Sequence, residues 1–431
     1  MLVSTALVMF MTPGLALFYG GLVRSKNVLG TIMQCFFALG AVSIVWFVAG
    51  YTLAFAPGNR VLGGLKYLFL TNVGATPSRL APTIPHTVYM TYQMMFAIIT
   101  PALIIGAVAE RMRFRGYVVF LSLWSLLVYS PVAHWVWGGG FLGAGPGRVG
   151  AIDFAGGTVV HINAGVAALA ALLYLGKRRG FGREAMHPHN IPMVVTGAAI
   201  LWFGWFGFNA GSALGSGALA GQAFLNTQMA TAAAMIGWLV AEWGRNKVPT
   251  TVGAASGAVA GLVAVTPAAG YVETWAAVLI GFAAGLICYA AVSLKPRLGY
   301  DDSLDVVGVH MVGGIVGALL LGLFATKAIN PAGADGLFYG HPVQLARQAI
   351  AVGVMMVYSF TVSMVLLKVT DLVAGLRVDE RAELTGLDLS QHAESAYVTV
   401  ESGTLVTHRP AASATKPSSS SSRRDAKEDS T

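Results

Sequence analysis

Long apolar runs alternate with short polar loops along most of the 431-residue chain. A helix needs about 20 mostly apolar residues to cross the roughly 30 Å hydrocarbon core of a bilayer. Eleven runs are that long or nearly so, and they cover approximately residues 2–19, 30–55, 88–109, 117–137, 154–175, 192–213, 223–243, 250–266, 275–294, 304–325 and 343–368. The pattern predicts an all-α integral membrane protein with eleven transmembrane helices.

The polar loops differ in their content of Lys and Arg. One alternate set of loops is rich in basic residues and holds Arg24, Lys26, Arg111, Arg113, Arg115, Lys177, Arg178, Arg179, Arg183, Arg245, Lys247, Lys295 and Arg297. The other set holds fewer, namely Arg60, Lys66, Arg79, Arg148, Lys327 and Arg347. Because loops rich in Lys and Arg stay in the cytoplasm, we expect the N-terminus outside and the C-terminus inside. The expected location is the cell inner (plasma) membrane, as a multi-pass protein.

The composition supports the membrane class and narrows the partners. Hydrophobic residues make up 55% of the chain and charged residues only 11%, whereas soluble domains carry about 25% charged residues. The net charge of +8 does not indicate a nucleic-acid partner, because the basic residues lie in short loops between apolar runs. Cys35 and Cys288 fall inside apolar runs, which argues against a disulfide framework or a cysteine metal site.

Two short segments repeat the same spacing between an Asp and a His. Asp153 precedes His161 by eight residues, and Asp302 precedes His310 by eight. Eight helical residues rise about 12 Å, so each His is expected near the membrane midplane. Antiparallel helices would bring both histidines together, as in an inverted repeat of helices 1–5 and 6–10. The simpler interpretation is a histidine satisfied by a neighbouring helix and an Asp153 that only caps its own helix.

Three aromatic clusters lie near the outer ends of predicted spans. They are Tyr92-Gln-Met-Met-Phe96, His134-Trp-Val-Trp137 and Trp205-Phe206-Gly-Phe208-Asn209-Ala-Gly-Ser212. An interfacial aromatic belt is the simpler interpretation. Convergence of these rings above His161, together with the Ser212 hydroxyl, would instead form a site for a small, weakly hydrated cation.

Several motifs resemble those of the Amt/Mep/Rh ammonium transporters, on the bacterial Amt side, and they occur in the order found in that family. They are Ala109-Glu-Arg111, Val136-Trp-Gly-Gly-Gly140, Asp153-Phe-Ala-Gly-Gly-Thr-Val-Val-His161-Ile-Asn-Ala, Gly204-Trp-Phe-Gly-Phe-Asn-Ala-Gly-Ser212 and Val306-Val-Gly-Val-His310. The resemblance covers about residues 2–397. It implies a homotrimer of eleven-helix subunits in the lipid bilayer, each with its own pore for ammonium or ammonia. It implies no cofactor and no enzymatic reaction.

The resemblance also implies roles for single residues. The implied substrate-binding and pore residues are Phe96, Trp137, Asp153, His161, Trp205, Phe208, Ser212, Thr266 and His310. Among them, Phe96, Trp137 and Ser212 form an outer site that recruits ammonium. Phe96 also stacks with Phe208 as a gate, and the two histidines pair in the pore.

The end of the chain divides into two parts in this interpretation. Residues 376–397 resemble the cytoplasmic tail that communicates between subunits and answers to PII-type nitrogen-signalling proteins. Residues 398–431 match no family motif, and their serine run and mixed charges predict disorder. The expected domains are therefore a transmembrane transporter domain at 1–375, a regulatory segment at 376–397 and a disordered tail at 398–431.

A mechanism follows from the cost of moving ions into an apolar pore. Burying a bare ammonium or potassium ion costs on the order of 20 kcal/mol in the idealised limit. Ammonium has a pKa roughly two units above neutral, so removing its proton costs only about 3 kcal/mol. Potassium has no such route. The expected path is therefore ammonium outside, neutral ammonia in the pore and a proton relayed separately by histidine.

Two other classes of function stay open at this stage. A membrane redox protein would use His161 and His310 as haem ligands, although no further His pairs appear on facing helices; a Soret band in its absorption spectrum would identify it. A sensor or transceptor would bind ammonium and signal through the cytoplasmic tail. His187-Pro-His189 is too weak a pattern to predict a metal site.

Overall fold

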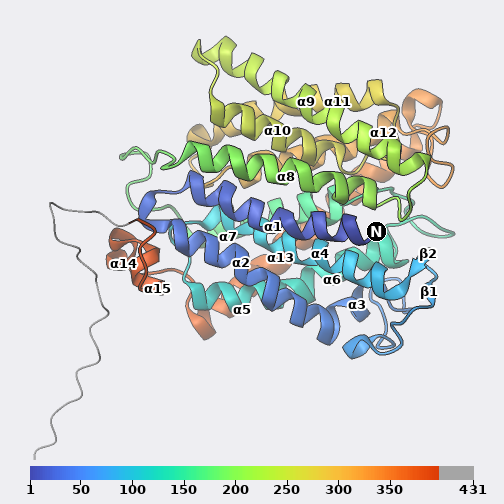
Figure 1. The fold of residues 1–431 in the computed structure, drawn as a ribbon, viewed down its shortest axis with the longest axis horizontal. Helices are drawn as coiled ribbons and strands as arrows, with labels where there is room; N and C mark the ends of the chain where they lie inside the picture. Colours follow the sequence, from blue (N-terminus) through green and yellow to red (C-terminus); the bar gives the residue numbers. More distant parts are fainter. Residues whose placement is uncertain (398–431) are drawn as a thin grey trace, which may run out of the picture. The chain divides into compact units, whose positions relative to one another are not determined.

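The computed structural model describes residues 1–397, and residues 1–396 form one compact unit. The tail predicted at 398–431 lies outside the described residues. Helices make up nearly all the regular structure of the described part, and one short hairpin accompanies them (Figure 1). The helical membrane class predicted from the sequence is confirmed.

Ten helical segments of the described residues are long and apolar enough to cross a membrane. They are Leu2–Leu22, Ser25–Phe55, His86–Val108, Phe114–Gly138, Gly157–Leu175, Ile191–Gly211, Ala218–Asn246, Thr274–Leu298, Val307–Phe324 and Val343–Ala374. The run predicted at 250–266 forms the shorter helix α10 (Thr251–Val265), with 15 residues. At about 1.5 Å per residue it is only about 22 Å long, and the buried chain at 266–270 continues it as turns.

Several of these segments contain more than one helical element. Apart from α10, the α-helices within these segments are α1 (Leu2–Leu22), α2 (Val28–Val45), α3 (Tyr51–Phe55), α4 (His86–Val108), α5 (Phe114–Trp124), α6 (Ser130–Ala133), α7 (Asn163–Leu175), α8 (Ile191–Gly211), α9 (Ala218–Asn246), α11 (Thr274–Leu298), α12 (Val312–Phe324) and α13 (Val343–Ala374). Wider π-helical turns lie at Trp46–Gly50, Ser125–Tyr129, His134–Gly138, Gly157–Ile162 and Val307–Met311. Short 3-10 turns lie at Ser25–Asn27, Leu68–Leu70 and Leu337–Tyr339. Turns of the π type are frequent at functional sites.

Glycines allow the helices to pack closely. Helix α1 packs along α8, and α9 packs against α10 and α11. A Cβ atom added at Gly197 would lie 2.3 Å from the backbone nitrogen of Phe18, and one at Gly14 would lie 2.6 Å from Ile200. Small residues at such contacts let helix backbones approach each other in membranes, which explains the high glycine content.

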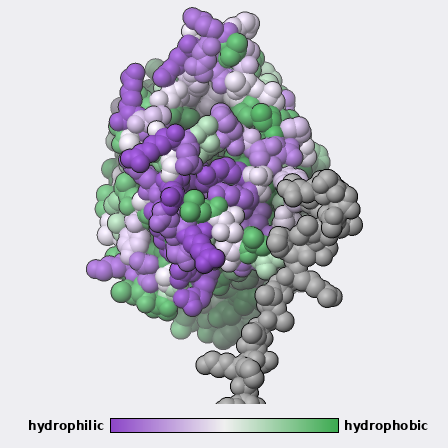
Figure 2. Space-filling view, turned by 90° about the vertical axis from the view of Figure 1, so that its left-hand side faces the viewer, coloured by the Kyte–Doolittle hydropathy of each residue, from purple (hydrophilic) through white to green (hydrophobic). Residues whose placement is uncertain are grey.

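The bundle has two ends with different structures. The tail end carries α14 (Glu380–Thr385) and α15 (Leu387–His392) with loops 23–27, 109–113, 176–190 and 299–306, and the opposite hairpin end carries β1 (Pro77–Ser78) and β2 (Ala81–Pro85) (Figure 1). The two strands are antiparallel, with Pro77 opposite Pro85 and Ser78 opposite Ala81. Figure 2 shows hydrophilic residues gathered on the tail end, where the basic loops of the sequence lie.

The segment after the last long helix docks on the tail end. The Leu387 amide donates to the side chain of Asn27, and the Asp388 carboxylate accepts from the Gly30 amide at the start of α2, both at 2.8 Å. The Arg113 amide donates to the Leu376 carbonyl at 2.7 Å. Residues 376–392 are therefore tied to the loops between helices, as a docked segment requires.

A network of buried charges joins four loops of the tail end. The Glu110 carboxylate accepts from Arg24 at 2.6 Å and pairs with Arg178 at 3.4 Å. Arg178 also pairs with Asp301 at 2.8 Å, and Arg111 donates to the Asp301 carbonyl at 2.7 Å. Burial alone would raise the pKa of Glu110, but hydrogen bonds and charge from Arg24 and Arg178 outweigh it and hold the pKa below its ordinary value. The network fixes these four loops relative to one another.

Candidate functional site

Asp153 caps the π-helical turn Gly157–Ile162. One carboxylate oxygen accepts from the amides of Gly156 and Gly157 and the other from the amide of Thr158, each at 2.8 Å. The Thr158 hydroxyl also donates to this carboxylate. Gly156 has φ +122°, a conformation that favours glycine. The carboxylate of Asp153 is thus occupied by donors of its own turn, as a helix N-cap would be.

Asp302 repeats this arrangement in the second predicted unit. Its two oxygens accept from the amides of Val306 at 3.1 Å and Val307 at 2.7 Å, at the start of the π-helical turn Val307–Met311. Burial raises the pKa of Asp302 to about 6, and the charge of Asp305 adds to the effect. The two Asp–His units that share a spacing in the sequence therefore share a local structure.

The two turns bring His161 and His310 together. Their Nδ1 atoms lie 3.3 Å apart, and the rings stack with centroids 5.4 Å apart and an angle of 20°. Both rings are buried. A Cβ atom at Gly165 would lie 2.4 Å from the Met311 amide nitrogen, so glycine after the first histidine is needed for the two segments to cross this closely.

The two histidines line a narrow, mostly apolar cavity. Its volume is about 10 Å³, roughly the space that one water molecule needs. It is lined by Met11, Leu15, Phe18, Ile99, Leu103, Val160, His161, Leu201, Trp205, Phe208, Val259 and His310. The Nε2 atom of His161 is buried without a hydrogen-bond partner among the described residues. Among the described residues that line this narrow cavity, only the histidines and Trp205 carry polar side-chain groups.

Thr266 reaches the site through Trp205. The Trp205 ring stacks on His161 with centroids 5.3 Å apart and an angle of 18°. Its indole Nε1 donates to the Thr266 hydroxyl at 2.9 Å, and that hydroxyl donates to the Leu262 carbonyl at 2.7 Å. Thr266 therefore holds the Trp205 ring parallel to the histidine.

A wider cavity lies at the hairpin end, and we call it the vestibule. Its volume is about 240 Å³, and it is lined by Leu80, Tyr89, Gln93, Phe96, Val136, Trp137, Phe154, Ser212 and Leu214. The Ser212 hydroxyl donates to the Phe208 carbonyl at 2.9 Å, which leaves its lone pairs to accept from another donor. The predicted trio of Phe96, Trp137 and Ser212 therefore shares one cavity.

Phe96 and Phe208 separate the vestibule from the narrow cavity. Phe96 lines the vestibule and Phe208 lines the narrow cavity. Their ring centroids are 4.2 Å apart with an angle of 34°. The Phe96 ring also meets the edge of Trp137 at 6.1 Å. The two adjacent rings therefore join the lining of the vestibule to that of the narrow cavity.

Sequence reasoning missed two groups of residues around this path. The first is its apolar wall, including Met11, Ile99 and Val160, because apolar side chains carry no chemical signature that distinguishes a pore wall from a core. The second lies toward the tail end, where Asp305 lines a cavity with His310. Its signal was the carboxylate five residues before the histidine, in the segment already singled out.

Comparisons with known proteins agree on one family. The sequence profile of the Ammonium Transporter Family matches residues 1–397. An ammonium transporter of Bacillus subtilis (strain 168) is 52% identical over 392 residues, which cover 91% of this chain and 96% of that protein. The crystal structure of Candida albicans Mep2 has a TM-score of 0.83 and 38% identity, covering 91% of this chain and 88% of that one. A structure described as a sensor Amt protein has a TM-score of 0.82 and 29% identity, covering 90% and 96%.

The profile matches all of the described residues, and one relative is more than half identical, so the family is shown without any argument from the site. The helical membrane architecture agrees with the solved structures of this family. The chain is a multi-pass membrane protein that belongs to the ammonium transporter family.

Proposed function

We propose that this ammonium transporter binds ammonium in the vestibule, removes a proton there and conducts ammonia along the narrow cavity past His161 and His310. The proton is relayed separately by the two histidines. The observation that carries the proposal is the narrow cavity itself, which is lined by apolar side chains and two stacked imidazoles and has room for about one water-sized molecule.

The vestibule suits a small cation that is about to lose a proton. Phe96 and Trp137 supply aromatic rings, which attract cations through their quadrupoles, and Ser212 supplies a hydroxyl acceptor. Among the described residues that line it there is no carboxylate. A bound ammonium ion is thus held without a counter-ion, and leaving as ammonia costs only about 3 kcal/mol at neutral pH.

The histidine pair suits proton transfer. Because the two Nδ1 atoms face each other at 3.3 Å, one ring donates and the other accepts. A proton that enters at Nε2 of the donating ring lets that ring pass its Nδ1 proton to the other ring, which then releases its own Nε2 proton. Both rings end neutral with their roles exchanged, and one proton has been relayed. Neutral imidazoles also leave the cavity without charge, so a bare cation entering it gains no compensation for its lost hydration.

The topology that we propose has eleven spans, with α10 as the short eighth span. In this topology the N-terminus is outside and the tail end lies in the cytoplasm, in keeping with the basic residues of its loops. Helices 1–5 and 6–10 then form an inverted repeat, and its two halves each contribute one Asp–His unit. The membrane in question is the cell inner (plasma) membrane.

Assembly and regulation complete the proposal. Three copies form a homotrimer with one pore per subunit, residues 1–375 form the transporter domain, and residues 376–397 regulate it from the cytoplasm. A PII-type nitrogen regulatory protein is the proposed partner at this face. A second function as an ammonium sensor is favoured by one observation, the similarity over 90% of the chain to a protein described as a sensor Amt protein.

Charge movement in proteoliposomes tests the proposed function. Purified protein is reconstituted and challenged with ammonium pulses and with potassium pulses of equal size. We expect charge movement with ammonium and none with potassium, because only ammonium can enter the cavity as a neutral molecule. Equal responses to both cations would contradict deprotonation, and uptake of ammonia without any charge movement would contradict the proton relay.

A further inference from the structure

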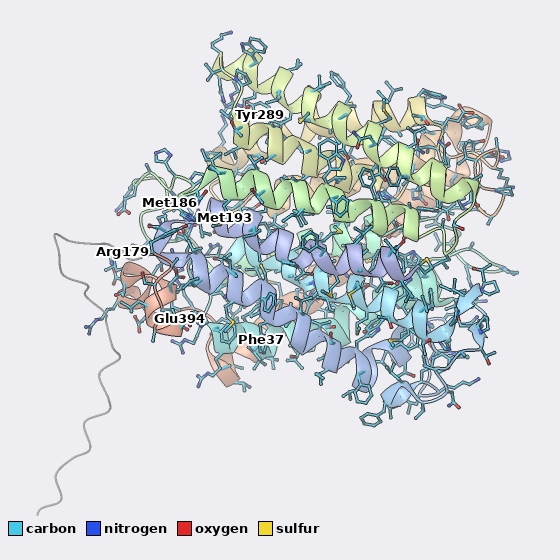
Figure 3. All side chains as sticks on the ribbon, viewed as in Figure 1. Phe37, Arg179, Met186, Met193, Tyr289 and Glu394 are labelled. Carbon is cyan, nitrogen blue, oxygen red and sulfur yellow. The ribbon has the colours of Figure 1, made fainter. Side chains whose placement is uncertain are left out.

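The path beyond the histidines consists of two connected cavities, and Asp305 lies where they meet. The first cavity, of about 30 Å³, touches His310. The second, of about 330 Å³, opens among the loops of the tail end, where Figure 3 shows Met186, one of its lining residues. Both cavities are lined by Leu22, Val252, Leu304 and Asp305. Among the described residues that line the smaller cavity, Asp305 is the only carboxylate.

The ammonium group of Lys295 lies beside Asp305, on the side of the wider cavity. Lys295 lies near the end of α11, and its Nζ donates to the Asp302 carbonyl at 2.8 Å and pairs with the Asp305 carboxylate. The side chain of Lys295 is 19% exposed and that of Asp305 is 33% exposed. Water partly reaches both charges, so a cation dissolved in the wider cavity can compete with the lysine for these acceptors.

The acceptors are anchored to the turn that carries His310. Asp305 has φ +63°, which is uncommon for a residue with a side chain, and its carbonyl accepts from the Val309 amide at 2.9 Å. The Asp302 carbonyl, the other acceptor of Lys295, belongs to the residue that caps the same turn. When the lysine leaves, the Asp302 carbonyl remains fixed by its turn, and the Asp305 side chain still projects from a fixed backbone.

The other charged groups around the wider cavity have partners of their own or lie farther out. Arg178 pairs with Glu110 and Asp301 in the buried network, and the Asp302 carboxylate accepts from its own turn. Glu184 is an exposed residue of the loop at 176–190. Asp305 is thus the carboxylate that a cation from the tail side can reach next to the path.

We propose that the Asp305 carboxylate and the Asp302 carbonyl form an inner binding site for ammonium or another small monovalent cation, and that Lys295 closes it with its own ammonium group. The lysine Nζ has three N–H donors and one positive charge, so it reproduces the contacts of a free ammonium ion. Lys295 keeps the exit clear of cations already present on the tail side. The effect on transport, but not the binding itself, rests on the proposed function.

Binding is tested with rubidium, a monovalent cation close to ammonium in size that is visible by anomalous X-ray scattering. Crystals of the wild type, of Lys295→Met and of Lys295→Met/Asp305→Asn are soaked in equal rubidium concentrations. We expect a peak beside the Asp305 carboxylate in Lys295→Met only. No peak there, or a peak that persists in the double variant, would overturn the site. Lys295→Gln replaces the Met variant if the latter fails to assemble.

Transport provides the second measurement. A tethered group acts at an effective concentration of millimolar or more, so Lys295 should compete strongly with internal ammonium for the site. The internal ammonium concentration that halves inward charge movement should therefore be about tenfold lower in Lys295→Met than in the wild type. Lys295→Arg should behave as the wild type, and the double variant should lose the added sensitivity. Unchanged sensitivity in Lys295→Met would contradict competition by Lys295, whatever the soaked crystals show. Because the crystals need no transport, failure of the site and failure of the proposed function give different results.

Discussion

At the scale of single residues, Trp137 and Ser212 supply the two contacts that a small cation can use without a counter-ion. Trp137 also donates its indole N–H to the Asp153 carbonyl at 2.9 Å, so its ring is fixed against the capped turn. Ser212 is fixed by Tyr92, whose hydroxyl lies 3.2 Å away. Both groups are therefore in place before a cation arrives, which reduces the entropy lost on binding.

Trp137→Leu and Ser212→Ala should each weaken ammonium binding by about 1 kcal/mol, or roughly fivefold, through the loss of an aromatic face or an acceptor. Initial rates measured over a range of ammonium concentrations should fall most at low concentration and converge at saturation. Trp243→Leu, at a tryptophan that is 60% exposed, is the matched control and should match the wild type. If both vestibule variants also match it at every concentration, ammonium is bound elsewhere.

Asp153 presents a choice between capping a helix and contacting the cation. Its carboxylate already accepts from four amides, the fourth being that of Val159 at 3.3 Å, and from the Thr158 hydroxyl, so capping is its main role in our account. Asp153→Asn replaces one acceptor oxygen by a donor and should lower the free energy of unfolding by about 1–2 kcal/mol. A thermal melt of the purified variant measures this. An unchanged melting temperature with weakened ammonium binding would assign Asp153 to the cation instead.

At the scale of elements, the sequence pattern located nearly every helix but not how the helices are broken. Hydrophobic runs reveal length, and the long runs at 88–109 and 343–368 correspond to α4 and α13. The π-helical turns at Gly157–Ile162 and Val307–Met311 could not be predicted, because they depend on carboxylate caps and close crossings between distant segments. The Asp–His spacing indicated a shared function, whereas the contact between the rings required the fold.

The same limits apply to the tail-end loops. Basic residues such as Arg24 and Arg178 were counted as evidence for orientation, yet their side chains also bind the buried Glu110. Pairing between loops so far apart in sequence leaves no local pattern. The motif Ala109-Glu-Arg111 was visible as a family likeness, but its structural role appears only when four loops are brought together.

Glu110→Gln should destabilise the protein by about 3–5 kcal/mol, because it leaves buried arginines without their partner. The folded-state pKa of Glu110 is lowered, so its contribution is present above the unfolded-state pKa of about 4.3. It is lost as pH falls through the lower folded-state value. The melting temperature of the wild type should therefore fall when the pH is lowered into the acid range. At neutral pH the melting temperature of Glu110→Gln should lie below that of the wild type.

The control for this prediction is Glu394→Gln, at an exposed residue just beyond the docked segment. Its free energy of unfolding should stay within about 0.5 kcal/mol of the wild-type value, so its melting temperature should be nearly unchanged. Equal behaviour of the two variants at neutral pH would mean that the tail-end network contributes nothing measurable to folding.

At the scale of the whole molecule, the docked segment connects the end of α13 to the loops of the tail end. Lys26 donates to the carbonyls of Glu383 and Leu384 at 3.0 Å and 2.7 Å. Arg377 donates to the carbonyl of Lys177 at 2.7 Å, in the loop that continues into the wall of the wider cavity. A change in this segment can therefore reach the exit of the path.

Two truncations separate this segment from the rest of the tail. Deleting 398–431 should leave folding and transport nearly unchanged, because its composition has too few apolar residues to dock. Cutting back to Leu376 should lower transport by removing the contacts to Asn27, Gly30 and Lys26. Transport rates and oligomeric state of both truncations are measured in proteoliposomes and detergent. Greater damage from the shorter deletion would move the functional boundary beyond residue 397.

The central claim is that His161 and His310 relay a proton while their cavity excludes cations. It is tested most directly by ammonium-driven charge movement in proteoliposomes of His161→Ala and His310→Ala, each first shown to assemble as the wild type does. Our account predicts that both variants lose this charge movement, because neither ring alone can pass a proton to the other. Unchanged ammonium current in both variants, with potassium still excluded, would mean that the histidines only fill space and that the relay is wrong.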